Sequence, residues 1–310
     1  MPKRDFLSID DLAPDELVAL LDGADKHKAD RRPLALLAGR TVALLFEKPS
    51  TRTRVSFDVA VHELGGHPLP LAAGELQLGR GENIEDTARV LSRYAHAIVL
   101  RTFAQDNLER MARAATVPVV NALSDYSHPC QALADMQTIR ERKGRLAGVR
   151  LAYLGDGNNV VHSLLFAGAK LGMQVAVATP SGYEPIPQVV GRATDIAAET
   201  GGVIELTHDP RTAVKGADVV YTDVWASMGQ EPEAEERTFM FRPYQLNTDV
   251  LAEAAADVVV LHCLPAHRGE EISADVLDGP FSAAFDQAEN RLHAQKALLC
   301  WLLLGAPDPR

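Results

Sequence analysis

Two arginines stand where a helix is expected to begin. The stretch FEKPSTRTRVSFDVA leaves an apolar strand pattern and passes through Ser50, Thr51, Arg52, Thr53 and Arg54 before the next apolar pattern. Hydroxyl groups suit a helix N-terminus because they accept hydrogen bonds from its unpaired N–H groups. Cations are disfavoured there because the helix dipole makes that end positive. A phosphate bound by the N–H groups and by Arg52 would remove the conflict. A solvent-exposed basic turn is the alternative.

Arg101 and an HPCQ motif follow the next two strand patterns. Arg101 closes the apolar run AIVLRT, and His128, Pro129, Cys130 and Gln131 come after the run VPVVNAL. Pro129 suits the first turn of a helix, where His128 and Gln131, three residues apart, would share one face. An imidazole beside a guanidinium can polarise a carbonyl oxygen, and a glutamine amide can orient an NH₂ group. A histidine that only caps or packs the helix is the alternative.

A third polar cluster follows the run DVVYTDVW. Asp223 lies at the end of that run, and Ser227 and Met228 come shortly after it in a glycine-containing turn. A carboxylate can bind an ammonium group, and the N–H groups of a turn can bind a carboxylate. Together these residues favour a site for the head group of an amino acid. Asp223 as an ordinary helix cap is the alternative.

The stretch GDGNNV, at 155–160, also follows a strand and precedes a helix. It is a poor dinucleotide motif because Val160 stands in place of the third glycine and no acid ends the next strand. We expect its asparagines, among them Asn159, to bind a small polar substrate instead. A tight turn without a ligand is the alternative.

The stretch LHCLPAHRG combines several reactive residue types. Cys263 lies at a strand end, and Pro265 restricts the backbone of Leu264, whose carbonyl group can thereby be directed into a site. Zinc bound by His262, Cys263 and His267 is disfavoured, because adjacent strand residues point to opposite faces. A hydrolase with a cysteine nucleophile is a further alternative.

These clusters need a scaffold, and short apolar strands alternate with helical patterns along the chain. The expected strands are TVALLFE, AIVLRT, VPVVNAL, LAYLGD, QVAVATP, VIELTHD, DVVYTDVW and DVVVLHCLPA. This alternation predicts an α/β protein of two domains, each a mostly parallel sheet flanked by helices on both faces. Ligands bind beyond the carboxyl ends of strands in such sheets, and the polar clusters lie there.

A Lys/Arg/Gly-rich stretch at 141–150 is the expected domain border. The predicted domains are 1–140 and 149–288, followed by a last helix at about 289–304. Arg291 would stand at the start of that helix, where a cation again requires a nearby anion.

Composition restricts the function classes. The 310 residues carry a net charge of -11, which argues against broad binding to nucleic acid or to acidic membranes. Three widely spaced cysteines without a CxxC motif fit a reducing compartment. The N-terminus has no signal-peptide core, and the longest apolar run, at 297–304, is too short to span a membrane. We therefore expect a cytoplasmic protein.

The motifs STRTR, HPxQ, DxxxSMG, HCLP and ENR, taken together and in this order, resemble the carbamoyltransferase family over nearly the whole chain. The ornithine-specific branch is the more similar one, because the aspartate-specific branch lacks SMG and HCLP. The resemblance implies an N-terminal carbamoyl-phosphate domain, a C-terminal ornithine domain and a last helix that returns to the first domain. It also implies a homotrimer with active sites shared between subunits, and no cofactor or metal.

The implied reaction is direct attack of the ornithine δ-amine on carbamoyl phosphate through a tetrahedral intermediate, giving citrulline and phosphate. The resemblance assigns carbamoyl-phosphate binding to Ser50, Thr51, Arg52, Thr53, Arg101, His128, Pro129, Cys130, Gln131, Cys263, Leu264 and Arg291, with Gln77 from the adjacent subunit. It assigns ornithine binding to Asn159, Asp223, Ser227 and Met228. Arg101, His128, Cys263 and Asp223 are the implied catalytic residues.

Two positions depart from family forms. Histidine can occupy the place of Gln77, and HCLP is often followed directly by arginine, whereas here Ala266 follows and Arg268 comes later. A carbamoyltransferase for putrescine or N-acetylornithine, and a noncatalytic binding protein of the same fold, stay open as alternatives. The residues would serve arginine synthesis and arginine breakdown equally.

Overall fold

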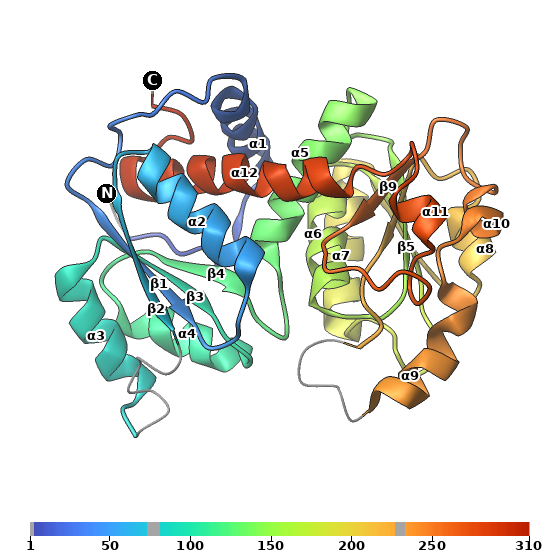
Figure 1. Cartoon of the computed structure of the whole chain (residues 1–310), viewed down its shortest axis with the longest axis horizontal. Helices are drawn as coiled ribbons and strands as arrows, with labels where there is room; N and C mark the ends of the chain where they lie inside the picture. The colour runs from blue at the N-terminus through green and yellow to red at the C-terminus, as the bar shows by residue number, and fades with distance from the viewer. Residues whose placement is uncertain (1–2, 73–80, 227–232, 310) are drawn as a thin grey trace. The chain divides into compact units, whose positions relative to one another are not determined.

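The computed structural model describes residues 3–72, 81–226 and 233–309 of the chain (Figure 1). It divides into two compact units, Met1–Ala134 with Glu289–Arg310, and Asp135–Ala288. Each unit contains one parallel sheet flanked by helices, so the predicted fold class is confirmed. The exact domain limits 1–140 and 149–288 stay a prediction. Among the described residues, no helix is long and apolar enough to cross a membrane.

The first unit has a four-stranded parallel sheet with the order β2-β1-β3-β4. Its strands are β1 (Thr41–Phe46), β2 (His67–Ala72), β3 (Ala97–Arg101) and β4 (Val119–Leu123). Its helical segments are η1 (Ile9–Asp11), α1 (Pro14–Ala29), α2 (Thr51–Glu63), α3 (Ile84–Tyr94), α4 (Gln105–Ala114), the start of α5 (Pro129–Lys143) and most of α12 (Ala284–Leu304).

Side chains of the first sheet alternate between its two faces, and helices cover both faces. Ala43, Leu45, Ile98 and Leu100 pack with α3 and α4 in one buried cluster. Figure 1 shows α2 and the red helix α12 on the opposite face. Strands buried on both faces read as continuous apolar runs, which is why β1 and β3 were predictable from sequence.

Strand β2 was not predicted. It contains Pro68 and Pro70, and proline cannot donate a hydrogen bond to a strand ladder, so its presence argues against a central strand. β2 lies at the edge of the sheet, where one side needs no partner strand. Its residues are also more exposed than those of β1, which weakens the apolar pattern.

The second unit has a five-stranded parallel sheet with the order β7-β6-β5-β8-β9. Its strands are β5 (Arg150–Leu154), β6 (Gln174–Ala178), β7 (Val203–Thr207), β8 (Val219–Thr222) and β9 (Val259–His262). Its helical segments, besides the rest of α5, are α6 (Asn159–Lys170), α7 (Pro187–Thr200), α8 (Pro210–Val214), α9 (Ala234–Phe241), η5 (Arg242–Tyr244), α10 (Thr248–Leu251), α11 (Ala274–Leu277) and the first residues of α12. Helices α8, α10 and α11 pack on one face in a buried cluster, and α6 and α7 cover the other (Figure 1).

Both sheets reverse their winding direction at one point. In the first sheet the chain moves from β1 to β2 on one side and then to β3 on the other, so the reversal lies between β1 and β3. In the second sheet it lies between β5 and β8. Helices on opposite faces leave the strand ends open at such a point, which makes it the usual ligand site of an open α/β sheet.

The last helix begins earlier than predicted. Helix α12 starts at Ala284, so Arg291 lies within the helix and not at its start. The expectation that Arg291 occupies the helix N-terminus is therefore wrong. The actual first turn contains Asp286, whose negative charge suits the positive end of the helix dipole.

Candidate active site

The STRTR motif forms the N-terminus of α2 at the exit of β1. Ser50 is the N-cap residue, and its side-chain oxygen accepts a hydrogen bond from the Thr53 backbone N–H at 3.3 Å. Arg52 is partly buried, whereas Arg54 is exposed. Of the two arginines, only Arg52 is thus partly buried, and the helical spacing predicts that the two side chains diverge.

Thr53 is the centre of a buried polar cluster. Its hydroxyl oxygen accepts hydrogen bonds from Arg291 Nη2 at 2.9 Å and from Arg101 Nη1 at 3.5 Å. Arg291 Nη1 donates to Gln131 Oε1 at 3.0 Å. The side chains of α2, β3, α5 and α12 meet here, and all four are at most 9% exposed.

His128 belongs to the same positively charged environment. Burial lowers the pKa of His128 well below its ordinary value, and the nearby Arg291, Arg101 and Arg52 lower it further. The imidazole is therefore neutral at neutral pH and can donate a hydrogen bond from one nitrogen only. Pro129 begins α5 directly after it, as predicted.

Cys130 plays no nucleophilic part in this cluster. Burial raises the pKa of its thiol to about 12. The thiol donates a hydrogen bond to the backbone oxygen of Asn121 at 3.3 Å. A protonated, buried thiol is a packing group, because only the thiolate is reactive.

The cluster in the first unit suits an anion. The guanidinium groups of Arg52, Arg101 and Arg291 are all near enough to His128 to affect its pKa. No carboxylate among the described residues lies within 4.0 Å of Arg52. Cations gathered at a helix N-terminus form an attractive site for a phosphate group.

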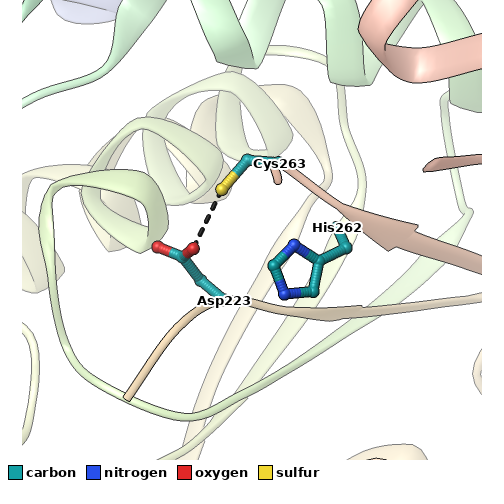
Figure 2. A group of neighbouring side chains, drawn as sticks. All are labelled: Asp223, His262 and Cys263. Carbon is teal, nitrogen blue, oxygen red and sulfur yellow. Dashed lines mark hydrogen bonds between the residues drawn. The ribbon is translucent and has the colours of Figure 1, made fainter. Parts of the chain in front are cut away.

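The second unit presents a carboxylate instead. Asp223 follows β8 and is 5% exposed. Its Oδ1 atom accepts a hydrogen bond from the Cys263 thiol at 2.9 Å (Figure 2). The same atom accepts a second one from the Val224 backbone N–H at 2.8 Å. Its Oδ2 atom accepts one from Asn158 Nδ2 at 3.0 Å. An oriented carboxylate of this kind can still bind an ammonium group, because its two oxygens together accept about four hydrogen bonds.

Of the two asparagines in GDGNNV, Asn158 contacts Asp223, whereas the family resemblance assigns ornithine binding to Asn159. Asn158 caps α6, and its Oδ1 atom accepts hydrogen bonds from the N–H groups of Val160 and Val161. The amide nitrogen is thereby turned towards Asp223. Asn159 is the first residue of α6 and lies beside this contact in the chain. The cap preference of asparagine before a helix was the available signal.

A buried ion pair next to this site was not predicted from the sequence. Arg237 in α9 pairs with Asp156 at 3.1 Å and donates to the backbone oxygen of Trp225 at 2.8 Å. Burial raises the pKa of Asp156 to about 6, although Arg237 acts in the opposite direction. The pair ties α9 to the exits of β5 and β8. No local pattern links residues so distant in sequence.

The HCLP motif occupies the exit of β9. His262 is the last strand residue, and Leu264 has a positive φ of 57° and a cis peptide bond to Pro265. Arg268, whose role the sequence left open, forms an exposed ion pair with Asp278 at 2.7 Å.

The separation of His262 from Cys263 that strand alternation predicts is not observed. Atoms of Asp223, His262 and Cys263 that can bind metal lie within 4.8 Å of one another. Strand alternation does not separate His262 from Cys263, because β9 ends at His262. Both ring nitrogens of His262 already have partners, however: the Leu264 backbone N–H at 2.9 Å and Glu271 Oε1 at 3.1 Å. These two hydrogen bonds therefore satisfy both ring nitrogens of His262, so the burial of this side chain requires no metal ion.

Three predicted site residues, Gln77, Ser227 and Met228, lie outside the described residues. The other residues form two groups. Ser50, Thr51, Arg52, Thr53, Arg101, His128, Pro129, Cys130, Gln131 and Arg291 belong to the first unit, and Asn159, Asp223, Cys263 and Leu264 to the second. Each group lies at or beside the winding reversal of its sheet.

Comparison with known proteins decides the family. Residues 4–141 match the carbamoyl-phosphate-binding domain of aspartate/ornithine carbamoyltransferases, and residues 147–302 match the domain that binds aspartate or ornithine. The chain belongs to the aspartate/ornithine carbamoyltransferase family. Its first unit is accordingly the carbamoyl-phosphate-binding domain of the family, and its second unit the amino-acid-binding domain.

Individual carbamoyltransferases are similar over almost their full length. An ornithine carbamoyltransferase of Parafrankia sp. (strain EAN1pec) is 66% identical, covering 98% of this chain and 97% of the relative. The solved ornithine carbamoyltransferase of Pyrococcus furiosus has a TM-score of 0.95 at 57% identity, covering 98% and 97%. The anabolic ornithine carbamoyltransferase of Campylobacter jejuni has a TM-score of 0.92 at 38% identity, covering 96% and 98%.

Proposed function

We propose that this chain transfers the carbamoyl group of carbamoyl phosphate to the δ-amine of L-ornithine, giving L-citrulline and phosphate. The observation that carries the proposal is the match to ornithine carbamoyltransferases over nearly the whole of both chains. The charges of the two units agree with it. The first unit gathers cations that suit a phosphate, and the second presents a carboxylate that suits an ammonium group.

The first unit binds and activates carbamoyl phosphate. The α2 N-terminus at Ser50 and Thr51, together with Arg52, holds the phosphate group that leaves. Arg101, the Thr53 hydroxyl and neutral His128 donate hydrogen bonds to the carbonyl oxygen and stabilise the tetrahedral oxyanion. Carbamoyl phosphate is already an activated mixed anhydride, so the reaction needs no covalent intermediate with the enzyme.

The second unit prepares the amine. Asp223 binds the ornithine α-ammonium group, while Asn159, Ser227 and Met228 contribute to the same amino-acid site. An alkyl ammonium group resembles that of lysine, with a pKa of about 10.4, so the δ-amine must lose a proton before it attacks. Cys263 and Asp223 receive or direct that proton. The Leu264 carbonyl and Gln131 orient the carbamoyl NH₂ group.

Substrate competition tests the assignment. The purified protein is mixed with carbamoyl phosphate and either L-ornithine, putrescine or N-acetylornithine, and ureido product and phosphate are measured. Ornithine should be preferred, because N-acetylornithine has no free α-ammonium group for Asp223, and putrescine has no α-carboxylate for the backbone N–H groups of the turn that contains Ser227 and Met228. Preference for another amine, or binding of carbamoyl phosphate without turnover, would refute the proposal.

The biological setting follows from the same proposal. A cytoplasmic homotrimer with shared sites is expected, with Gln77 reaching the carbamoyl phosphate of a neighbouring subunit. The residues can catalyse either direction, and the relatives named anabolic support a role in arginine synthesis. The partners are then two small molecules and further copies of the chain, without nucleic acid or membrane.

A further inference from the structure

Leu264 has an unusual backbone conformation. Among the described residues other than glycine, it alone has a positive φ, at 57°. A bulky side chain is sterically disfavoured in this region, and such a conformation persists only when its surroundings enforce it. Hydrogen bonds to neighbouring buried side chains supply this constraint.

The side chain of His262 holds the backbone of Leu264. The Leu264 N–H group donates to His262 Nδ1 at 2.9 Å, so Nδ1 carries no proton. The proton of the neutral ring is then on Nε2, which donates to Glu271 Oε1 at 3.1 Å. Glu271 in this way selects the one tautomer that can accept the hydrogen bond from Leu264.

The Glu271 carboxylate is held in place by hydrogen bonds to one of its oxygens. Its Oε1 atom also accepts a hydrogen bond from the His267 backbone N–H at 2.6 Å, which closes the loop that follows the HCLP motif. The side chains of His262 and Glu271 are completely buried. A buried carboxylate with two donors on one oxygen has little freedom to move.

The backbone of His262 has a second buried support. Its N–H group donates to Gln287 Oε1 at 2.9 Å. Gln287 Nε2 in turn donates to Asp135 Oδ1 at 2.6 Å and to Tyr221 Oη at 3.0 Å, which fixes the orientation of the amide. Residue 262 is thus held through both its backbone and its ring, immediately before Cys263 and Leu264.

We propose that Glu271 and His262 are positioning residues that set the Leu264 carbonyl and the Cys263 thiol for the carbamoyl transfer. This inference rests on the proposed function. Neither residue needs to touch a substrate. Their effect is exerted through the backbone between them and the reacting groups, where a displacement of 1 Å can lower a rate by about 100-fold.

Glu271→Leu and Glu271→Gln form the principal test. Leucine removes the acceptor for both hydrogen bonds, whereas the glutamine oxygen can accept both, and its amide can face His267 Nδ1, which lies 3.6 Å from Oε2. Glu271→Leu should lower kcat for citrulline formation by about 100-fold. Glu271→Gln should stay within about threefold of the unaltered enzyme. The affinity for inorganic phosphate should be unchanged in both, since that site belongs to the first unit.

Hydrogen exchange at the Leu264 amide gives a readout that does not depend on activity. Exchange should be faster in Glu271→Leu and near its original rate in Glu271→Gln. If Glu271→Leu does not fold, His262→Asn and His262→Leu replace it, because the asparagine oxygen can stand for Nδ1 and leucine cannot. Equal kcat and equal exchange in the paired variants would overturn the inference. An unaltered enzyme that makes no citrulline would instead refute the proposed function, while the exchange measurement would still decide the positioning role.

Discussion

Thr53 and Arg291 are 238 residues apart in the chain, yet Arg291 Nη2 lies 2.9 Å from Thr53 Oγ1. Arg101 approaches the same oxygen from β3. A hydroxyl oxygen has two lone pairs and one proton. With two guanidinium donors on the lone pairs, the Thr53 proton points away from both arginines and is available to an oxygen of the ligand.

Thr53→Val should impair both stability and catalysis. The variant keeps the shape of the side chain but leaves two buried guanidinium N–H groups without their acceptor, which costs about 1–3 kcal/mol of unfolding free energy. Urea denaturation measures that loss, and kcat should fall with it. Thr53→Ser keeps the hydroxyl and is the matched control. An unchanged kcat in folded Thr53→Val would contradict the role of this proton.

Arg52→Gln should weaken carbamoyl-phosphate binding without unfolding the protein. A hydrogen bond to a charged group contributes about 1.5–3 kcal/mol, which corresponds to a loss of affinity of about 10- to 150-fold. Isothermal titration calorimetry measures the affinity. Arg54→Gln is the control, because Arg54 is exposed and two residues further along the same helix. Equal affinities in the two variants would sink the assignment of the phosphate site.

Cys263→Ala should lower kcat or the affinity for ornithine, because the Asp223 carboxylate loses the thiol as a donor. No carbamoyl group should be found on Cys263 of the unaltered enzyme during turnover, since the amine attacks carbamoyl phosphate directly. Intact-protein mass spectrometry of a rapidly quenched reaction tests this. A carbamoyl thioester on Cys263 would favour a covalent mechanism.

Asp156 should make stability fall as pH rises. With its pKa at about 6 in the folded protein and at the ordinary 3.8 in the unfolded chain, folding takes up a proton between these values. The contribution of this group to stability is therefore complete below pH 3.8 and is lost up to about pH 6. Between these two pH values the contribution of Asp156 to the free energy of unfolding falls by about 1.4 kcal/mol per pH unit.

Comparison with Asp156→Asn isolates this effect from other groups. From about pH 4.5 to about pH 7 the difference in unfolding free energy should shift by about 2 kcal/mol in favour of the variant. Asp195→Asn, at an exposed position, is the control. A constant difference between unaltered protein and Asp156→Asn across this range would show that Asp156 does not titrate there.

Mixed oligomers test whether the site is shared. Suppose that Gln77→Ala and Arg101→Ala each severely impair activity. Trimers reassembled from both variants contain some sites with an intact Arg101 and an intact Gln77 from the neighbour, so activity should exceed that of either variant alone. If no activity returns in mixed trimers confirmed by native mass spectrometry, each chain builds its site by itself.

Sequence alone predicted what local chemistry determines. Ser50 as a helix cap, Pro129 at a helix start and the buried strands all follow from preferences of a few neighbouring residues. Sequence alone did not predict the features that depend on a partner far away in the chain. Arg237 is significant only because Asp156 faces it, and Pro68 is tolerated only because β2 lies at a sheet edge. The choice between Asn158 and Asn159 required the direction of a single side chain.

The first unit consists of two separate chain segments, Met1–Ala134 and Glu289–Arg310, and this has a consequence for protein synthesis. A ribosome synthesises the whole second unit before it supplies the remaining piece of the first. Arg291 belongs to that later segment, so nascent chains cannot assemble the polar cluster around Thr53 until the whole second unit has been synthesised. Truncated mRNAs that end after the codons of the second unit would therefore yield chains that retain the Asp223 site and lack the completed anion site.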